Sequence, residues 1–248
     1  MTLDDASNVE IIPMLSLGDK VGGSGSAMRS CVKDLVKLYA SLLNAGKHQL
    51  ESGTISAPGS PLKQVPFLWS PKISMNTITY RETSYALGWA RVQTPGSMGA
   101  VGINPTLLAP SQIPLVGRGV HSGVILYHQG CKPGNLAAIN LVPEIRGAVL
   151  VITNSLALND AADWLGELYL EAYLDVKQRN DYVLFEQMSA RNALDWYRTE
   201  PEYRRKTRNF LHIFRLMMPR CVASQIKLRF KLYSLFRSSH SPVGPAGG

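Results

Sequence analysis

The sequence predicts an α+β fold in which helices pack on an antiparallel sheet. Three apolar runs, at 123–128, 136–142 and 148–153, follow one another closely, and the polar or Pro-Glu segments between them are typical of turns. Apolar residues at helical spacing occur on both sides of this group. Strands joined by such short connections pair antiparallel, so we expect a β-meander covered by helices.

Before the meander, the first predicted helix covers residues 30–45. Its apolar residues recur at helical spacing, Ser30 suits the N-cap position and Gly46 suits the C-terminal end. Four prolines in residues 47–78 favour loops with one short helix near 62–69. We expect a further strand at 85–92, and then a long loop at 94–119 that borders a site.

After the meander, a helix is predicted over residues 160–174, capped by Asn159 or Asp160. Its predicted buried face consists of Ala161, Trp164, Leu165, Leu168, Tyr169, Ala172 and Tyr173. A weaker helical pattern runs from Asp181 to about Tyr197. The predicted division is a flexible segment at 1–25, a folded domain at 26–178, and a basic helical tail at 179–248 whose end is disordered.

The net charge of +8 arises from the last part of the chain. Ten Lys and Arg residues from Arg204 onward occur without any Asp or Glu, which leaves 16 basic and 18 acidic residues in the rest. A body with this balance gives no reason to expect nucleic acid as a partner. The alternatives for the tail are a solvated extension, binding to an anionic membrane surface or a partner protein, and nucleic-acid binding.

The sequence favours a cytoplasmic protein. No apolar run approaches the roughly 18 to 20 residues that cross a bilayer, and the acidic start lacks the pattern of a secretion signal. Cys31, Cys131 and Cys221 are odd in number and far apart, which favours reduced thiols. We expect no cofactor.

The most informative segment is His128-Gln129-Gly130-Cys131, at the predicted exit of the first meander strand. His128 there either satisfies hydrogen bonds at a sheet edge or takes part in a site. Cys131 is either a buried structural thiol or a nucleophile beside His128. No metal site is expected from these residues and His121, because their spacing matches no ligand motif.

The order of strand, His-x-Gly triplet, turn, two strands and helix resembles the last sheet motif of the serine β-lactamase and penicillin-binding-protein superfamily. The resemblance is closest to the β-lactamase-related proteins of filamentous fungi and covers roughly residues 20 to 175, the later part of that fold. The matching segments are 26–35, 85–89, 128–130, 133–134, 141–144 and 151–155.

This resemblance implies a serine hydrolase or acyltransferase that acts on ester, amide or thioester substrates. His128, Gln129 and Gly130 would dock a small-molecule substrate, and the backbone N–H of Cys131 would donate to the oxyanion. A glycine at position 130 leaves room for a substrate along the strand. Gln129 departs from the Thr or Ser that the family commonly has.

The family's nucleophile is a serine followed three residues later by a lysine, which takes its proton. Three pairs have this spacing, Ser30–Lys33, Ser60–Lys63 and Ser224–Lys227, whereas chance predicts about one. Ser60 and Lys63 are catalytic candidates only because of their place in the order of motifs along the chain. The prolines near them leave no room for a rigid helix.

We therefore expect a chain that lacks the catalytic half of this fold and is inactive when isolated. A complementary half-domain or a homodimer is the expected partner, because half a domain exposes apolar surface. The competing hypothesis is a non-catalytic binding or regulatory protein on the same scaffold.

Overall fold

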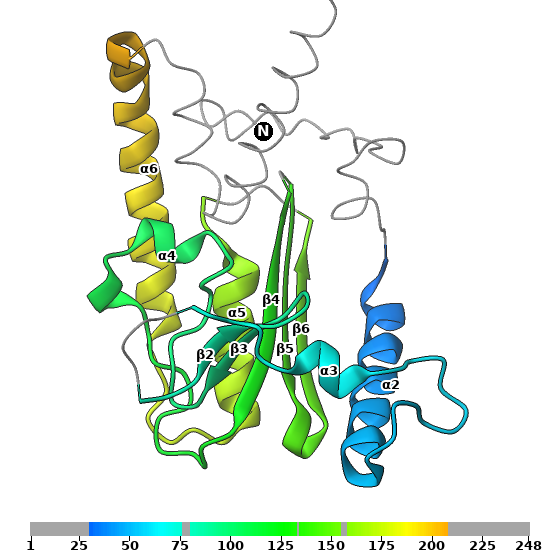
Figure 1. Ribbon diagram of the computed structural model, residues 1–248. Coiled ribbons are helices and arrows are strands. Elements are labelled where there is room, and N and C mark those ends of the chain that lie inside the picture. Colours follow the sequence, from blue (N-terminus) through cyan, green and yellow to red (C-terminus); the bar gives the residue numbers. More distant parts are fainter. Residues whose placement is uncertain (1–29, 76–79, 133, 155–157, 208–248) are drawn as a thin grey trace, which may run out of the picture. The chain divides into compact units, whose positions relative to one another are not determined.

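The computed structural model describes residues 30–75, 80–132, 134–154 and 158–207, and its centre is a six-stranded antiparallel sheet (Figure 1). The strands are neighbours in chain order: β1 (Ile73–Ser74), β2 (Thr83–Tyr85), β3 (Ala90–Gln93), β4 (Val124–Lys132), β5 (Asn135–Val142) and β6 (Gly147–Thr153). The predicted α+β class and the meander β4–β5–β6 are confirmed.

The helices are α2 (Val32–Ser52), α3 (Val65–Trp69), α4 (Asn104–Leu107), α5 (Ala161–Tyr173) and α6 (Tyr182–Thr207), with the short 3₁₀ turns η1 (Pro110–Gln112) and η2 (Pro143–Ile145). The chain divides into two compact units, and the second begins at Asp195 within α6. Residues 195–207 of that second unit are helical.

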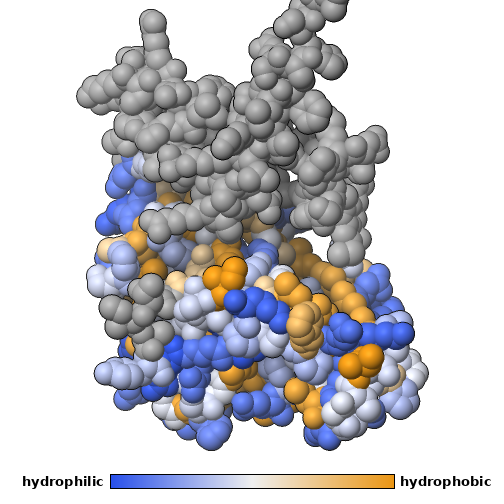
Figure 2. All heavy atoms as spheres, in the orientation of Figure 1, coloured by the Kyte–Doolittle hydropathy of each residue, from blue (hydrophilic) through white to orange (hydrophobic). Residues whose placement is uncertain are grey.

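Helices cover both faces of the sheet, because apolar residues alternate along β4. Leu126 packs with Leu42, Leu43 and Trp69 from α2 and α3. Its neighbours Ile125 and Tyr127 point to the opposite face, where they pack with Leu170 of α5. The first turns of α6 add to the α5 side, where Tyr182 and Phe185 pack against Trp164. In the view of Figure 2, hydrophobic residues also reach the surface between the sheet and α2.

The helix predicted at 30–45 is longer than expected and has different ends. It passes through Gly46 and ends at Ser52, where Gly53 adopts a left-handed conformation with φ of 65°. Gly46 allows close packing instead: a Cβ there would lie 2.3 Å from Cζ3 of Trp69. Ser30 is not the N-cap, since Cys31 holds that position without a side-chain cap bond.

The single strand predicted at 85–92 is wrong, because these residues form a hairpin between β2 and β3. Gly88 in the turn has φ of 79°, a conformation that glycine reaches without strain. The turn is closed by a bond from Ala86 N to Trp89 O of 2.7 Å. The Gly-Trp pair therefore marks a reversal of the chain.

The predicted buried face of the helix at 160–174 is partly wrong. Its bounds and its cap are confirmed, since α5 covers Ala161–Tyr173 and Asp160 accepts a bond from Asp163 N. However, Leu165, Tyr169, Ala172 and Tyr173 are exposed, and acidic residues are buried instead. Two of these acidic residues, Asp163 and Glu171, accept hydrogen bonds from polar groups of the surrounding loops and strands.

Other predictions have mixed outcomes. The short helix near 62–69 is confirmed as α3, and the helix after Asp181 as α6, whose first turn is capped by a bond of 3.0 Å from Leu184 N to Asp181 Oδ1. The segment 94–119 is mostly loop, with α4 and η1 inside it. Residues 1–25, the basic end after residue 207 and the pair Ser224–Lys227 lie outside the described residues. The boundary at residue 178 stays a prediction.

Candidate functional site

The segment 128–131 lies inside strand β4, not at its exit. β4 pairs with β5 as far as Lys132 opposite Asn135, so the chain reverses only after Lys132, and Gly134 has φ of 79°. His128 and Gly130 therefore point to the α2 side, opposite Ile139 and Ala137. Gln129 and Cys131 point to the α5 side. The four predicted site residues are thus divided between two faces.

Tyr85 of β2 lies beside His128. Its hydroxyl oxygen is 3.3 Å from Nε2 of His128, and the two rings meet edge to face at a centroid distance of 6.4 Å. Burial lowers the pKa of His128, and a backbone hydrogen bond with Gln129 opposes this shift. A neutral imidazole at pH 7 has one nitrogen that donates and one that accepts.

The edge of β4 beside β3 opens at this point. β3 pairs with β4 only from Val124 to Tyr127, whereas β4 continues to Lys132. Within the described residues, no strand pairs with this edge beyond Tyr127. Those N–H and C=O groups of residues 128–132 that point to this edge are thus without a strand partner, and an extended ligand is able to pair with them.

At Gly130 no side chain covers the α2 side of this segment. It is exposed, and a Cβ built on it would meet only Ala137, at an ordinary contact distance of 3.6 Å from Cβ to Cβ. The packing of the protein itself therefore does not require a glycine here. The absent side chain leaves space for a ligand beside His128.

Gln129 and Cys131 belong to the opposite side. Gln129 is buried, and its Nε2 donates to Oδ1 of Asp163 at 2.7 Å. Cys131 is a free cysteine, and burial of its thiol, followed by the nearby charge of Asp160, raises its pKa. The Cys131 thiol does not lie on the side of His128, so the interpretation of the two as a nucleophile pair loses its support.

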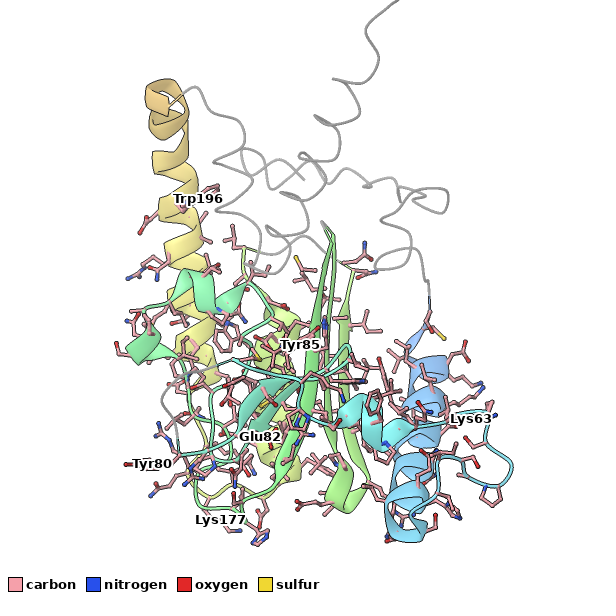
Figure 3. All side chains as sticks on the ribbon, viewed as in Figure 1. Lys63, Tyr80, Glu82, Tyr85, Lys177 and Trp196 are labelled. Carbon is pink, nitrogen blue, oxygen red and sulfur yellow. The ribbon has the colours of Figure 1, made fainter. Side chains whose placement is uncertain are left out.

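The Ser-x-x-Lys candidates do not join this site. Ser60 accepts a hydrogen bond from Leu62 N at 3.2 Å, and Lys63 is exposed in the connection between α2 and α3. Figure 3 shows Lys63 on the outer side of α2, far from Tyr85 in the sheet. Ser30 and Lys33 are exposed at the start of α2.

A buried acidic row on α5 was missed by the sequence interpretation. Asp160, Asp163, Glu167 and Glu171 are all buried, and none of the ion pairs among the described residues includes them. Their spacing of three and four residues places them along one flank of the helix. That spacing was visible in the sequence, but a row of acids normally indicates a solvent-exposed face.

Neutral donors hold this row in place. Asn104 donates to Oδ2 of Asp163 at 3.0 Å, in addition to the bond from Gln129. Asn180 donates to both oxygens of Glu171, and Gly117 N donates to one of them. The row thereby fastens the long loop at 94–119 to the sheet and to the start of α6.

Burial disfavours the charged forms of these carboxyl groups. It raises the pKa of Asp160 to about 7, with a further contribution from the charge of Asp163. Burial also raises the pKa of Asp163 to about 6, against the hydrogen bonds from Gln129 and Asn104. The pKa of Glu167 lies well above its ordinary value for the same reason.

Metal-binding groups and membrane-crossing helices are both absent from the described residues. Those residues contain no group of three or more His, Cys, Asp or Glu side chains arranged to hold a metal ion. Within the same ranges, none of the helices has the length and apolarity that a membrane-crossing segment needs. Comparison with known proteins gave no family model, no curated protein and no solved structure that matches this chain.

Proposed function

We propose that this chain is a relative of the serine β-lactamase and penicillin-binding-protein superfamily that keeps a substrate-docking strand but lacks a nucleophile beside it. The observation that carries the proposal is the open edge of β4 next to His128 and Gly130. The order of the sheet supports it as well, since the strand with the triplet is followed by two strands and a helix. An ester, amide or thioester is the substrate class.

The docking step follows from the geometry of β4. An extended acyl group pairs with the unpaired edge at residues 128–132, and its bulk lies in the space that Gly130 leaves. The Tyr85–His128 pair lies beside this segment and gives the docking site a polar wall. In this arrangement the backbone N–H of Cys131 is the donor for the acyl oxygen.

The second candidate function is non-catalytic binding on the same strand. It is favoured by the position of Lys63, which lies far from Tyr85, the neighbour of His128, in Figure 3, so that this candidate lysine is not beside the docking strand. Both hypotheses predict the same non-covalent complex and no covalent adduct of the isolated chain, and they differ in whether a complementary half-domain supplies the nucleophile. The two described cysteines are free thiols, which supports our proposal of a cytoplasmic location.

Nuclear magnetic resonance of the full chain tests the docking strand. We expect penicillin G or a small N-acyl amino-acid ester to shift the backbone amide signals of Gly130 and Cys131 saturably. His128→Ala should weaken this binding, whereas His121→Ala, in an exposed loop, should not. Unchanged amide signals at millimolar ligand would contradict the docking proposal.

A fluorescent fluorophosphonate tests the missing nucleophile separately. The isolated chain should remain unlabelled in a mass spectrum, because a serine without a neighbouring base reacts poorly. One equivalent of serine adduct would overturn this part of the proposal and leave the docking step standing.

A further inference from the structure

Strand β6 has the composition of an interior strand although it lies at the edge of the sheet. Residues 148–152 are all apolar, and the strand contains no charged residue or proline. Edge strands normally carry such residues to prevent pairing with another chain. Yet Gly147 alone is buried in β6, whereas most of β5 is buried.

Helices contact both faces of β6, and within the described residues no strand pairs with its edge away from β5. α2 contacts β6 from one face and α5 contacts it from the other. In the described part of the chain, β6 pairs with β5 alone. Ile152, which is 38% exposed, lies on the α2 side of this edge strand, because it pairs with Ala137.

An apolar stripe on α5 borders the same edge. Gly166 faces Ala138 and Asn140 of β5, and Asp163 bonds to Gln129 of β4, so the acidic flank of α5 points towards β4. At about 100° per residue, Leu165 and Tyr169 lie on the other flank. This flank borders β6, because the ring of Tyr173 lies directly over Gly147.

This stripe is exposed and uncharged. Tyr169 is 55% exposed and Tyr173 51%, and Leu165 completes the row at a spacing of four residues. Solvated helix faces usually carry charged residues, and α5 instead has its acids in the interior. The edge of β6 and the stripe together form one uncharged surface, which we call the β6 surface.

We propose that the β6 surface is a homodimer interface, in which β6 pairs antiparallel with β6 of a second copy. Antiparallel pairing of one strand with itself is self-complementary under a two-fold axis. With Leu150 at the centre, Val149 meets Val151 and Ala148 meets Ile152, so all pairs among residues 148–152 are apolar. Arg146, the nearest charge, then lies opposite Asn154 and not opposite its own copy.

The exposed tyrosines alone do not supply enough buried area for a stable dimer, so the interface must include the β6 strands. Two half-exposed tyrosines from each copy contribute on the order of 400 Å² in total. A stable interface buries roughly 1,200 Å² or more, so the paired strands and their flanking residues must supply the rest. Residues at the centre of β6 are therefore expected to matter more than those at its ends.

Sedimentation velocity of the full chain over a range of concentrations tests the interface. We expect a reversible dimer of twice the chain mass. Ile152→Lys and Tyr169→Lys should each raise the dissociation constant at least tenfold, because the two-fold axis places each new charge in the interface twice. The matched control is Ile73→Lys, which has the same substitution on the edge strand at the other side of the sheet. Circular dichroism must show that all three variants are folded.

Hydrogen exchange separates a second copy from other occupants of the edge. Half of the β6 amides point away from β5, and these should lose protection when the protein is diluted below the dissociation constant. A monomer at all concentrations would overturn the proposal. Protection that does not depend on concentration would overturn it too, because a segment of the same chain would then cover the edge. A dimer that only Ile73→Lys disrupts would place the interface at β1.

Discussion

Raising the pH should destabilise the fold, because the acidic row of α5 is buried without a described cationic partner. Asp160 has a pKa of about 7 when folded and 3.8 as its ordinary value. One pKa unit corresponds to 1.36 kcal/mol, so up to about 4 kcal/mol of unfolding free energy is lost between about pH 4 and 7. Because the folded state binds the Asp160 proton more tightly than the unfolded state does, this part of the unfolding free energy is fully present below about pH 4 and is lost as the group ionises.

The neighbours of Asp160 contribute in the same direction. The pKa of Asp163 is raised to about 6, which corresponds to about 3 kcal/mol by itself. The two shifts do not add, because each carboxylate affects the other. Burial also raises the pKa of Glu167, which faces Asp163 and Glu171 on α5 and Tyr182 on α6, well above its ordinary value.

Urea unfolding between about pH 5 and 8 measures this effect. In the unmodified protein the free energy of unfolding should fall with pH, and in Glu167→Gln it should fall less and be higher at pH 8. The control is Asp181→Asn, in which an exposed cap is replaced by another good cap, so its pH dependence should equal that of the unmodified protein. Stability that rises with pH over this range would refute the buried-row interpretation.

Three further predictions concern single residues. Gly46→Ala should lower the free energy of unfolding by about 1–3 kcal/mol in urea titrations, because the new Cβ meets the Trp69 ring, although alanine has the better helix propensity. The control Gly130→Ala has ordinary contacts and should change the free energy of unfolding by less than about 1 kcal/mol. An equal effect of both substitutions would contradict the packing argument. The imidazole of His128 should titrate below its ordinary pKa in NMR spectra; a higher value would mean that burial does not dominate there. The Cys131 thiol should react slowly with Ellman's reagent at pH 7, since its pKa is raised, and fast reaction would show that the thiolate is stabilised.

The sequence predicted those elements whose pattern is local. The meander was found because apolar runs of strand length alternate with turn residues, and α5 was found because its apolar residues and its cap have helical spacing. The hairpin at 85–92 was missed, because a single Gly88 reverses the chain without a second turn residue beside it. The end of α2 was misplaced because Gly46 is a packing contact with Trp69, a residue 23 positions away in the chain.

The candidate site was predictable only in part. The order of residues indicated His128 and Gly130, but no local pattern pairs His128 with Tyr85, which comes from another strand. The acidic row was visible as a spacing, yet its burial depends on Asn104, Gln129 and Asn180. Donors so distant in the chain are brought together by the tertiary fold, which a helical pattern does not report.

Neighbouring side chains of β4 point to opposite faces of the sheet, and this has a practical consequence for mutagenesis. Gln129 stands between His128 and Gly130 in the chain, but its amide is anchored to Asp163 on the far side of the sheet. Replacement of Gln129 by Thr or Ser would leave Oδ1 of Asp163 without the donor that it has in the protein interior. A loss of binding in such a variant would then report damage to the scaffold, and only a compensating change at Asp163 would separate the two effects.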